Sequence, residues 1–323
     1  MAFKKISSEI KRSKIPYYAK NILRQIIPSV FYQSLLNKKL SAINNYNKTD
    51  VINRVNYYNR LEKFTSVGPN AIELQNMQIF KSPKAYNFDT FEFTRYFKKH
   101  LKANFLFGDV TYNPDVPSIQ KSRPITGDNA NAVLLKLDKK RHFVFINDDK
   151  KFADKKNMLI GRGTMSQPHR ITFMEKYFNS QLCDLGQVNK TGGNTAWFKP
   201  KISITEHLGY KFILSLEGND VATNLKWIMS SNSIAVMPKP KYETWFMEGL
   251  LIPDYHYILI KDDYSDLEEK LCYYIDHDAE ALDIVNNANQ FVKQFLNKKQ
   301  EGLISLMVLQ KYFYCTGQID HIS

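Results

Sequence analysis

Cysteine is scarce in this sequence, and long apolar runs are missing from it. The three cysteines, Cys183, Cys272 and Cys315, have neither the paired spacing of a disulfide framework nor the Cys/His spacing of a zinc site. We expect reduced thiols that fill apolar space. No stretch reaches the ~18 apolar residues that a membrane-spanning helix needs, and no apolar signal segment follows the basic N-terminus. The sequence therefore predicts a soluble or peripheral protein without a secretory signal.

Acidic residues are too few to balance the basic ones. The 323 residues contain 45 Lys and Arg against 32 Asp and Glu, which gives a formal net charge of +13. Such an excess attracts phosphate in nucleic acid, in anionic lipid or in a sugar nucleotide. The sequence has no zinc-finger spacing, RNA-recognition strand or basic region followed by heptads. We predict no nucleic-acid partner and keep a basic nucleic-acid-binding protein as an alternative.

The first 60 residues combine basic and apolar character. Apolar residues recur on one side of a predicted helix, with Lys20, Arg24, Lys38 and Lys39 off that side and Pro28 at a kink or a second helix start. This pattern fits a helix that lies in the plane of an anionic membrane, through residues 1–40. It fits equally an ordinary helix that packs its apolar side onto the protein, and both interpretations stay open.

The next segment alternates short apolar runs with polar connections. We predict strands at 76–80, 104–107 and 142–146, and a helix over 89–101 that Asp89 caps. The polar residues 147–157 form the expected junction to a second α/β unit. A two-domain α/β protein is the fold class that this periodicity supports.

The second unit is expected to begin with a strand at 158–160 and a helix over 168–178. Later strands are predicted at 210–216 and 233–237, with a helix between them over 221–229. Polar residues follow the strand ends, where ligands bind in open α/β sheets. Three further helices are predicted, at 265–275 with Ser265 as the cap, at 279–296 and at 301–314.

Two segments have the chemistry of a phosphate site. Gly161 to Arg170 is a glycine-flanked turn between a strand and a helix, and it carries Arg162, Gly163 and Arg170. Backbone N–H groups at a helix start bind anions, and arginines add charge-assisted hydrogen bonds. In Glu217-Gly218-Asn219-Asp220, the glycine allows a ligand to approach the backbone closely, and Lys226 follows in the next helix.

A carboxylate after the strand at 104–107 is the candidate general base. Asp109 follows Phe107-Gly108, and a carboxylate at a strand end suits removal of a proton from an acceptor hydroxyl. Asp115 is the alternative base, and a loop aspartate is often only a turn former. Three basic residues are nearby, namely Lys121, Arg123 and Arg141. We expect them to contact donor or acceptor, and the alternative is that they are ordinary surface charges.

The order of short motifs resembles a known family. E-G-N-D-x-A-x-N-x-K-W at 217–227, S-N-S-I-A-V-M at 231–237 and E-x-W-F at 243–246 follow one another as in glycosyltransferase family 90, which includes protein O-glucosyltransferases and capsule xylosyltransferases. Its bacterial members act in lipopolysaccharide or capsule assembly. The similarity covers residues 105–291 and is clearest over 161–266.

The resemblance implies a GT-B-like fold, in which two Rossmann-like domains face a cleft. The parts would be a basic helical segment (1–60), an acceptor domain (61–150), a nucleotide-sugar domain (151–290) and a C-terminal helix that returns to the first domain (291–323). It also implies an inverting transferase that moves glucose or xylose from a UDP-sugar to a lipopolysaccharide-core, lipooligosaccharide or capsule saccharide. We expect it in the cytoplasm, peripheral at the inner membrane.

The same resemblance implies roles for single residues. Asp109 would be the base, and Arg162 and Arg170 would hold the donor diphosphate. The remaining implied donor contacts are Gly163, Glu217, Gly218, Asn219, Lys226 and Glu243. Gly161 stands where the family has an aromatic residue, and Glu217 and Asn224 stand where its protein-glucosylating members have arginine. For Glu217 and for Glu243 the alternative is a helix cap or a surface carboxylate.

No cofactor and no metal are expected. Asp276-His277-Asp278 has the spelling of the D-x-D motif that holds Mn²⁺ or Mg²⁺ in other glycosyltransferases, but it falls between two predicted helices and does not follow a strand. Cationic residues and helix N–H groups would neutralise the diphosphate instead. The alternative within this fold is a non-catalytic sugar- or lipid-binding scaffold.

Overall fold

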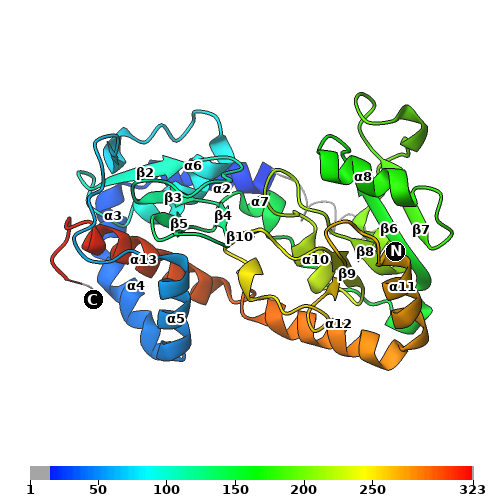
Figure 1. The fold of residues 1–323 in the computed structure, drawn as a ribbon. Coiled ribbons are helices and arrows are strands. Elements are labelled where there is room, and N and C mark those ends of the chain that lie inside the picture. The colour runs from blue at the N-terminus through cyan, green and yellow to red at the C-terminus, as the bar shows by residue number, and fades with distance from the viewer. Residues whose placement is uncertain (1–14, 322–323) are drawn as a thin grey trace.

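The structure is a computed structural model that describes residues 15–321. It is a mixed α/β protein with a four-stranded sheet, a five-stranded sheet and a two-stranded ladder, and Figure 1 shows helices packed around the two larger sheets. None of the helices within residues 15–321 is long and apolar enough to cross a bilayer.

The first sheet has the strand order β1-β2-β3-β5. β2, β3 and β5 are parallel, and β1 is antiparallel to β2. All residues of β3 and β5 are buried, as expected of parallel strands that are covered on both faces. The strands are β1 (Ile72–Glu73), β2 (Lys102–Leu106), β3 (Ser118–Gln120) and β5 (Ala132–Leu134).

The second sheet is fully parallel and has the order β11-β9-β8-β6-β7. In chain order this is the 2-1-3-4-5 arrangement of flavodoxin-like sheets, so the direction of winding reverses between β6 and β8. The strands are β6 (Lys156–Gly163), β7 (Cys183–Gln187), β8 (Tyr210–Leu214), β9 (Ile234–Met237) and β11 (Ile258–Leu259).

Helices precede, separate and follow the strands. Before the first sheet lie α2 (Ile15–Ile26), α3 (Ser29–Ser34), α4 (Leu36–Leu40) and α5 (Lys48–Tyr58). Around the sheets lie α6 (Lys84–Thr94), α7 (Lys139–His142), α8 (Pro168–Tyr177), α9 (Ile204–His207) and α10 (Leu225–Met229). The chain then forms α11 (Leu267–Asp276), α12 (Asp278–Lys293) and α13 (Lys298–Cys315), with short 3₁₀ turns at Ser41–Asn45, Leu74–Asn76, Phe152–Asp154, Thr195–Trp197 and Glu248–Leu250.

A short antiparallel ladder joins the two halves of the chain. β4 (Ser122–Pro124) pairs with β10 (Tyr242–Thr244), so that Arg123 lies opposite Glu243. Both side chains are almost fully buried, and Arg123 Nε lies 2.8 Å from Glu243 Oε1. The main hydrophobic cluster also extends across both sheets, since it contains Ile119 of β3 and Ile160 of β6. The GT-B arrangement of two domains stays a prediction.

Most of the predicted elements around the site are confirmed. The strand at 104–107 corresponds to β2, and the strand–turn–helix around residues 158–178 corresponds to β6 and α8. β8 and β9 match the predicted strands at 210–216 and 233–237, and α12 and α13 match the last two predicted helices. Pro28 separates α2 from α3, as its missing N–H and fixed φ predict.

Several other predictions are wrong. Residues 76–80 form no strand, because the chain pairs with β2 only at Ile72–Glu73 and then enters a 3₁₀ turn. Residues 143–146 also lie outside the strands; their apolar side chains pack on the core without pairing with a sheet. The helix expected at 89–101 is α6, and Asp89 is a fully buried residue in its middle rather than its cap. The residue that precedes α11 is Asp266, not Ser265.

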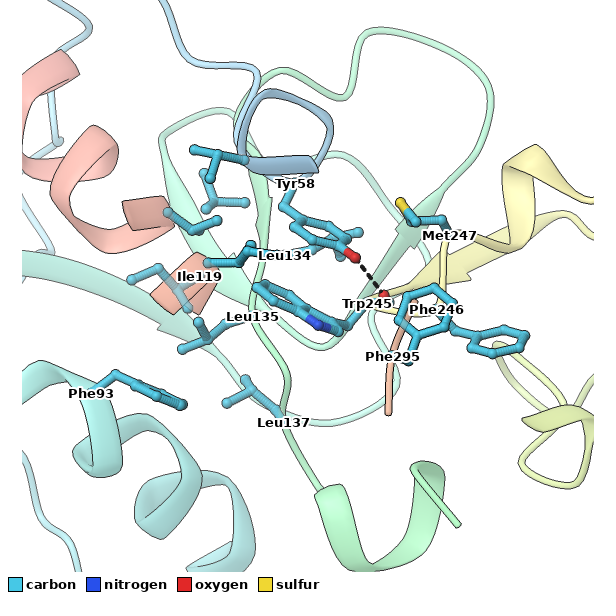
Figure 2. Close-up of a cluster of buried hydrophobic side chains, with 14 of the residues drawn as sticks. Tyr58, Phe93, Ile119, Leu134, Leu135, Leu137, Trp245, Phe246, Met247 and Phe295 are labelled. Carbon is cyan, nitrogen blue, oxygen red and sulfur yellow. Dashed lines mark hydrogen bonds between the residues drawn. The ribbon is translucent and has the colours of Figure 1, made fainter. Parts of the chain in front are cut away.

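An aromatic stack fixes the centre of the main cluster (Figure 2). The rings of Tyr58 and Trp245 are stacked with centroids 3.8 Å apart, and the Tyr58 hydroxyl donates to the Trp245 carbonyl at 2.8 Å. Trp245 Nε1 donates to Glu301 of α13, which is also paired with Arg54 of α5. Segments separated by up to about 245 residues therefore meet at Trp245.

Trp245→Ala should destabilise the protein strongly. The substitution leaves a cavity among fully buried side chains and removes a partner of Glu301, and such changes cost about 3–5 kcal/mol. Urea unfolding followed by circular dichroism measures this free energy. Phe64→Ala is the control, since Phe64 is 85% exposed, and it should change stability by no more than about 0.5 kcal/mol. Equal effects of the two changes would contradict the central role of Trp245.

Candidate functional site

A pocket opens where the winding of the second sheet reverses. β6 and β8 are neighbours, but the chain leaves β6 toward β7 and leaves β8 toward β9, and such a point forms a crevice at the carboxyl ends of the strands. The pocket has a volume of about 390 Å³. Its lining includes Asp109, Arg141, Arg162, Gly163, Thr164, Gln167, Arg170, Gly218 and Asn219. Seven of the predicted site residues are therefore brought together.

Asp109 reaches this pocket from the first half of the chain. It follows β2 after Gly108, whose φ of +110° is a backbone conformation that favours glycine. One carboxylate oxygen of Asp109 lies 2.6 Å from Lys121 Nζ, and the other accepts a hydrogen bond from the Asn219 amide at 3.1 Å. Asp109 thus joins the segment after β2 to the segment after β8.

Lys121 is buried and holds the Asp109 side chain in place. Its side chain is 1% exposed, and its ammonium lies between Asp109 and Asp220, 2.8 Å from the latter. Burial alone would raise the pKa of Asp109, but the hydrogen bond and charge of Lys121, together with the Asn219 amide, lower it below its usual value. Asp109 is therefore a carboxylate at neutral pH, the form that accepts a proton.

Asp115, the alternative base, lies elsewhere. It is exposed, it is not part of the pocket lining, and its backbone carbonyl accepts a hydrogen bond from Asn131. The geometry therefore favours Asp109 over Asp115 as the candidate base.

Arg170 presents a positive charge that no acidic side chain within residues 15–321 neutralises. Its guanidinium donates to the carbonyl oxygens of Glu217, Leu216 and Thr164 at 2.9–3.1 Å. Among residues 15–321 it forms no ion pair, and burial lowers its pKa. These hydrogen bonds tie the turn before α8 to the segment after β8, and the remaining charge makes the pocket attractive for an anion.

Arg162 also lines the pocket, but its charge is shared. It forms an ion pair with Asp184 of β7 at 2.7 Å, and Lys199 lies on the same carboxylate at 2.9 Å. Burial would raise the pKa of Asp184, but hydrogen bonds from Lys199, Arg162 and Tyr210 lower it to about 2. Arg141, by contrast, is a largely exposed cation at the pocket edge, 3.9 Å from Asp138.

Gly161 has a structural reason for departing from the family pattern. A Cβ at this position would lie 2.9 Å from the Leu185 side chain of β7 and 3.1 Å from that of Leu214 of β8. Neighbouring strands therefore leave no room for a side chain here, and the aromatic residue expected from the resemblance would not fit.

A second pocket of about 280 Å³ adjoins the first and shares Leu216, Gly218, Asn219 and Val221 with it. Glu217 lies in its wall, where one carboxylate oxygen accepts the backbone N–H groups of Lys241 and Tyr242. Burial raises the pKa of Glu217 to about 7, although these two hydrogen bonds oppose the shift. Glu217 is therefore neither a helix cap nor a plain surface carboxylate.

Four predicted contacts need correction. Lys226 is fully buried and lines neither pocket, and its charge is already neutralised by Glu248, a residue of the second pocket's wall. Glu243 and Arg123 are buried against each other in the β4–β10 ladder and form a structural ion pair. Lys121 does not line the pocket, and it acts on the pocket through Asp109.

Sequence reasoning missed some residues of the two pockets. Asp220 is buried and also accepts a hydrogen bond from Ser122 at 2.6 Å. Lys239, Lys241 and Tyr242 line the second pocket just after β9. Their position after the carboxyl end of a predicted strand was a usable signal.

Metal ligands are not grouped in the described part of the chain. Between residues 15 and 321 no three His, Cys, Asp or Glu side chains lie close enough together to hold an ion. In Asp276-His277-Asp278, which separates α11 from α12, Asp278 is paired with Lys211 and His277 is stacked on Tyr273.

Comparisons with known proteins show which family this chain resembles. The family model described as "Glycosyl transferase family 90" matches residues 136–314. The O-glucosyltransferase LpsA of Dichelobacter nodosus is 39% identical over 303 residues, which are 93% of this chain and 95% of that protein. Protein O-glucosyltransferase 2 of Danio rerio is 30% identical over 111 residues, 34% of this chain and 22% of that protein.

An uncharacterized protein, 179R, of Invertebrate iridescent virus 6 is 31% identical over 132 residues, 37% of this chain and 11% of that protein. The family match spans more than half of the chain. It includes the strand-to-helix turn at Gly161 to Arg170, the Glu217 segment and nearly all of α13. Together with the near full-length similarity to LpsA, it identifies this chain as a member of glycosyltransferase family 90, and hence as a glycosyltransferase.

Proposed function

We propose that this enzyme transfers a sugar, of the glucose or xylose type, from a UDP-sugar to a saccharide acceptor. The acceptor would be lipopolysaccharide core, lipooligosaccharide or a capsule precursor, and transfer would invert the anomeric configuration without a metal ion. The single observation that carries the proposal is the pocket in which the Asp109 carboxylate faces the cations Arg141, Arg162 and Arg170.

The diphosphate would lie against these cations at the carboxyl end of β6. Arg170 has no carboxylate partner within the described residues, and Arg141 is largely exposed and only 3.9 Å from Asp138, so both retain N–H groups that can bind phosphate oxygens. The start of α8 adds the positive end of a helix dipole. Stabilisation of charge on a leaving group by one such donor amounts to ~3–4 kcal/mol in other enzymes.

The nucleoside would occupy the adjoining pocket. Its wall is formed by residues 215–225 and 237–242, and it offers both apolar surface from Leu216 and Val221 and the carboxyl group of Glu217. One oxygen of Glu217 is fixed by two backbone N–H groups, while no described residue hydrogen-bonds the other. The free oxygen can accept hydrogen bonds from ribose hydroxyls.

The reaction would proceed by direct displacement. Asp109 takes the proton of the acceptor hydroxyl, whose oxygen forms a bond to the anomeric carbon of the donor sugar. The bond from that carbon to the diphosphate oxygen breaks, and UDP leaves with the electron pair. Lys121 keeps Asp109 ionised and oriented, since it is fixed between Asp109 and Asp220.

A thermal-shift panel tests the donor and the metal together. UDP-sugars should raise the melting temperature of the protein, whereas GDP- and CMP-sugars should not, because ligands stabilise only the state that binds them. The shift should persist in EDTA. A shift with GDP- or CMP-sugars alone would overturn the donor assignment, and loss of the UDP shift in EDTA would overturn metal independence.

Asp109→Asn should retain the UDP-induced shift and lose transfer by about 10²–10⁴-fold, the usual contribution of a general base. UDP release in the presence of donor and an acceptor extract measures the rate. Asp115→Asn is the matched control and should be near the wild-type rate, since Asp115 is exposed outside the pocket. Near-normal turnover of the Asp109 variant would remove the base assignment.

The raised pKa of Glu217 predicts that the stability of the folded protein depends on pH. This pKa is about 7 in the folded chain against 4.5 for the free group, so the folded state binds more protons between these values. The stability it contributes is fully present below pH 4.5 and is lost as the pH rises through 7. Relative to Glu217→Gln, the wild type should lose about 2–3 kcal/mol over this range.

Urea unfolding at several pH values measures this difference. Glu175→Gln, which removes an exposed carboxyl group of α8, is the matched control and should follow the wild-type pH dependence. If Glu217→Gln also follows the wild type, the burial of the Glu217 carboxyl group is contradicted.

A further inference from the structure

Helix α2 packs onto the protein with its polar side. The Tyr17 hydroxyl donates to Asp89 of α6 at 2.8 Å, Arg24 is ion-paired with Glu92 of the same helix, and Asn21 is only 2% exposed. Asp89 is fully buried and also accepts the backbone N–H of Lys139 at 2.9 Å. These contacts fix the rotation of α2 about its axis.

The apolar side of α2 consequently faces solvent. Ile15 is 77% exposed, Leu23 61% and Ile26 72%, and these positions recur at the helical spacing that places them on one face. An ordinary surface helix is oriented the other way, with its apolar side on the core. The expectation of a helix packed through its apolar side is thus wrong for α2.

The exposed apolar surface continues past Pro28 into α3. Over seventeen consecutive residues it comprises seven large side chains: Ile15, Ile22, Leu23, Ile26, Ile27, Val30 and Phe31. We call this set the α2–α3 face. Contiguous exposed apolar patches of this kind mark interaction sites, whereas single exposed apolar residues are normal.

The sequence segment that contains the α2–α3 face has a strongly one-sided charge. Residues 1–49 contain ten Lys and Arg but one acidic residue, Glu9. Lys20, Lys38 and Lys39 are exposed in the described part of this segment. The segment therefore carries most of the chain's net charge of +13. An apolar row flanked by lysines is the pattern of helices that lie in the surface of anionic bilayers.

The charge also distinguishes between possible occupants. In a symmetric dimer the same patch of each copy contacts the other, and two segments with this excess of positive charge would repel each other. An anionic bilayer matches both features of the segment. Its negatively charged headgroups attract the lysines, and its apolar layer can bury the isoleucine and leucine side chains.

We propose that the α2–α3 face docks this protein on an anionic bilayer, with α2 and α3 lying in the interfacial plane. The docking does not depend on the identity of donor or acceptor, so it stands or fails separately from the proposed transfer reaction. It would make a lipid-linked saccharide accessible to an enzyme in which no described helix spans the membrane.

Vesicle flotation tests the docking. The wild-type chain should float with vesicles of phosphatidylcholine that contain about 30% phosphatidylglycerol, and much less with pure phosphatidylcholine. Binding should decrease in about 0.5 M salt, because salt screens the attraction to the headgroups. Equal flotation with both vesicle types, or none with either, would overturn the proposal.

A matched pair of variants separates the α2–α3 face from general apolar exposure. Leu23→Asn/Ile26→Asn should weaken partition into anionic vesicles about tenfold or more, because both side chains are lost from the inserted face. The melting temperature should not fall, since both residues are exposed. Phe64→Asn removes an exposed apolar side chain that is not part of the α2–α3 face and should float like the wild type.

Two outcomes would contradict the bilayer as the occupant. Flotation of the Leu23→Asn/Ile26→Asn variant at the wild-type level would show that α2 is not inserted. A wild-type dimer in light scattering that becomes a monomer in this variant would assign the α2–α3 face to a second copy of the chain.

Discussion

The buried ion pair between Arg123 and Glu243 sets the alignment on which the site depends. Arg123 also donates to the carbonyl oxygens of Tyr57 and Ala132, and Glu243 also accepts the hydroxyl of Tyr57. Removing one partner of such a pair leaves an unpaired buried charge, which costs about 3–5 kcal/mol in other proteins. Its main effect here is geometric, because it fixes β4 against β10.

That alignment is transmitted along the chain to the pocket. Lys121 and Ser122 directly precede Arg123, and both bind Asp220 in the segment after β8. Lys121 in turn holds Asp109. A shift of β4 by one residue would turn the Ser122 side chain to the opposite face, because side chains alternate along a strand, and would move Lys121 with it. The carboxylate of one half and the arginines of the other are therefore positioned by one short ladder.

The sequence predicted the second sheet and its pocket better than the first sheet. β6, α8, β8 and β9 have strong apolar patterns and clear turns, and polar residues at their ends mark the pocket. β1, β3 and β5 of the first sheet have only two or three residues, too few for a periodic signal. Residues 143–146 show why apolar alternation is insufficient: they pack on the core without pairing with a strand.

Charge partners were the least predictable part of the site. Lys226, Arg123 and Glu243 have the residue types that phosphate and sugar contacts need, but their charges are neutralised by partners 22 to 120 positions away. Spacing along the chain contains no information about such pairs. Arg170 was identified because its position at a strand–helix turn is a local feature.

Helix α13 has a consequence for synthesis of the protein. Its side chains, including Ile304, Val308 and Phe313, complete the apolar core against α4, α5 and α6, and Figure 1 shows it beside α4 and α5. They leave the ribosome about 180 residues after β5. The ribosome adds ~5–20 residues per second, so α13 is synthesised roughly 10–40 s after β5. During this interval the apolar core of the first half of the chain is not covered by α13. Chaperones acting on the growing chain would have their main substrate in that interval.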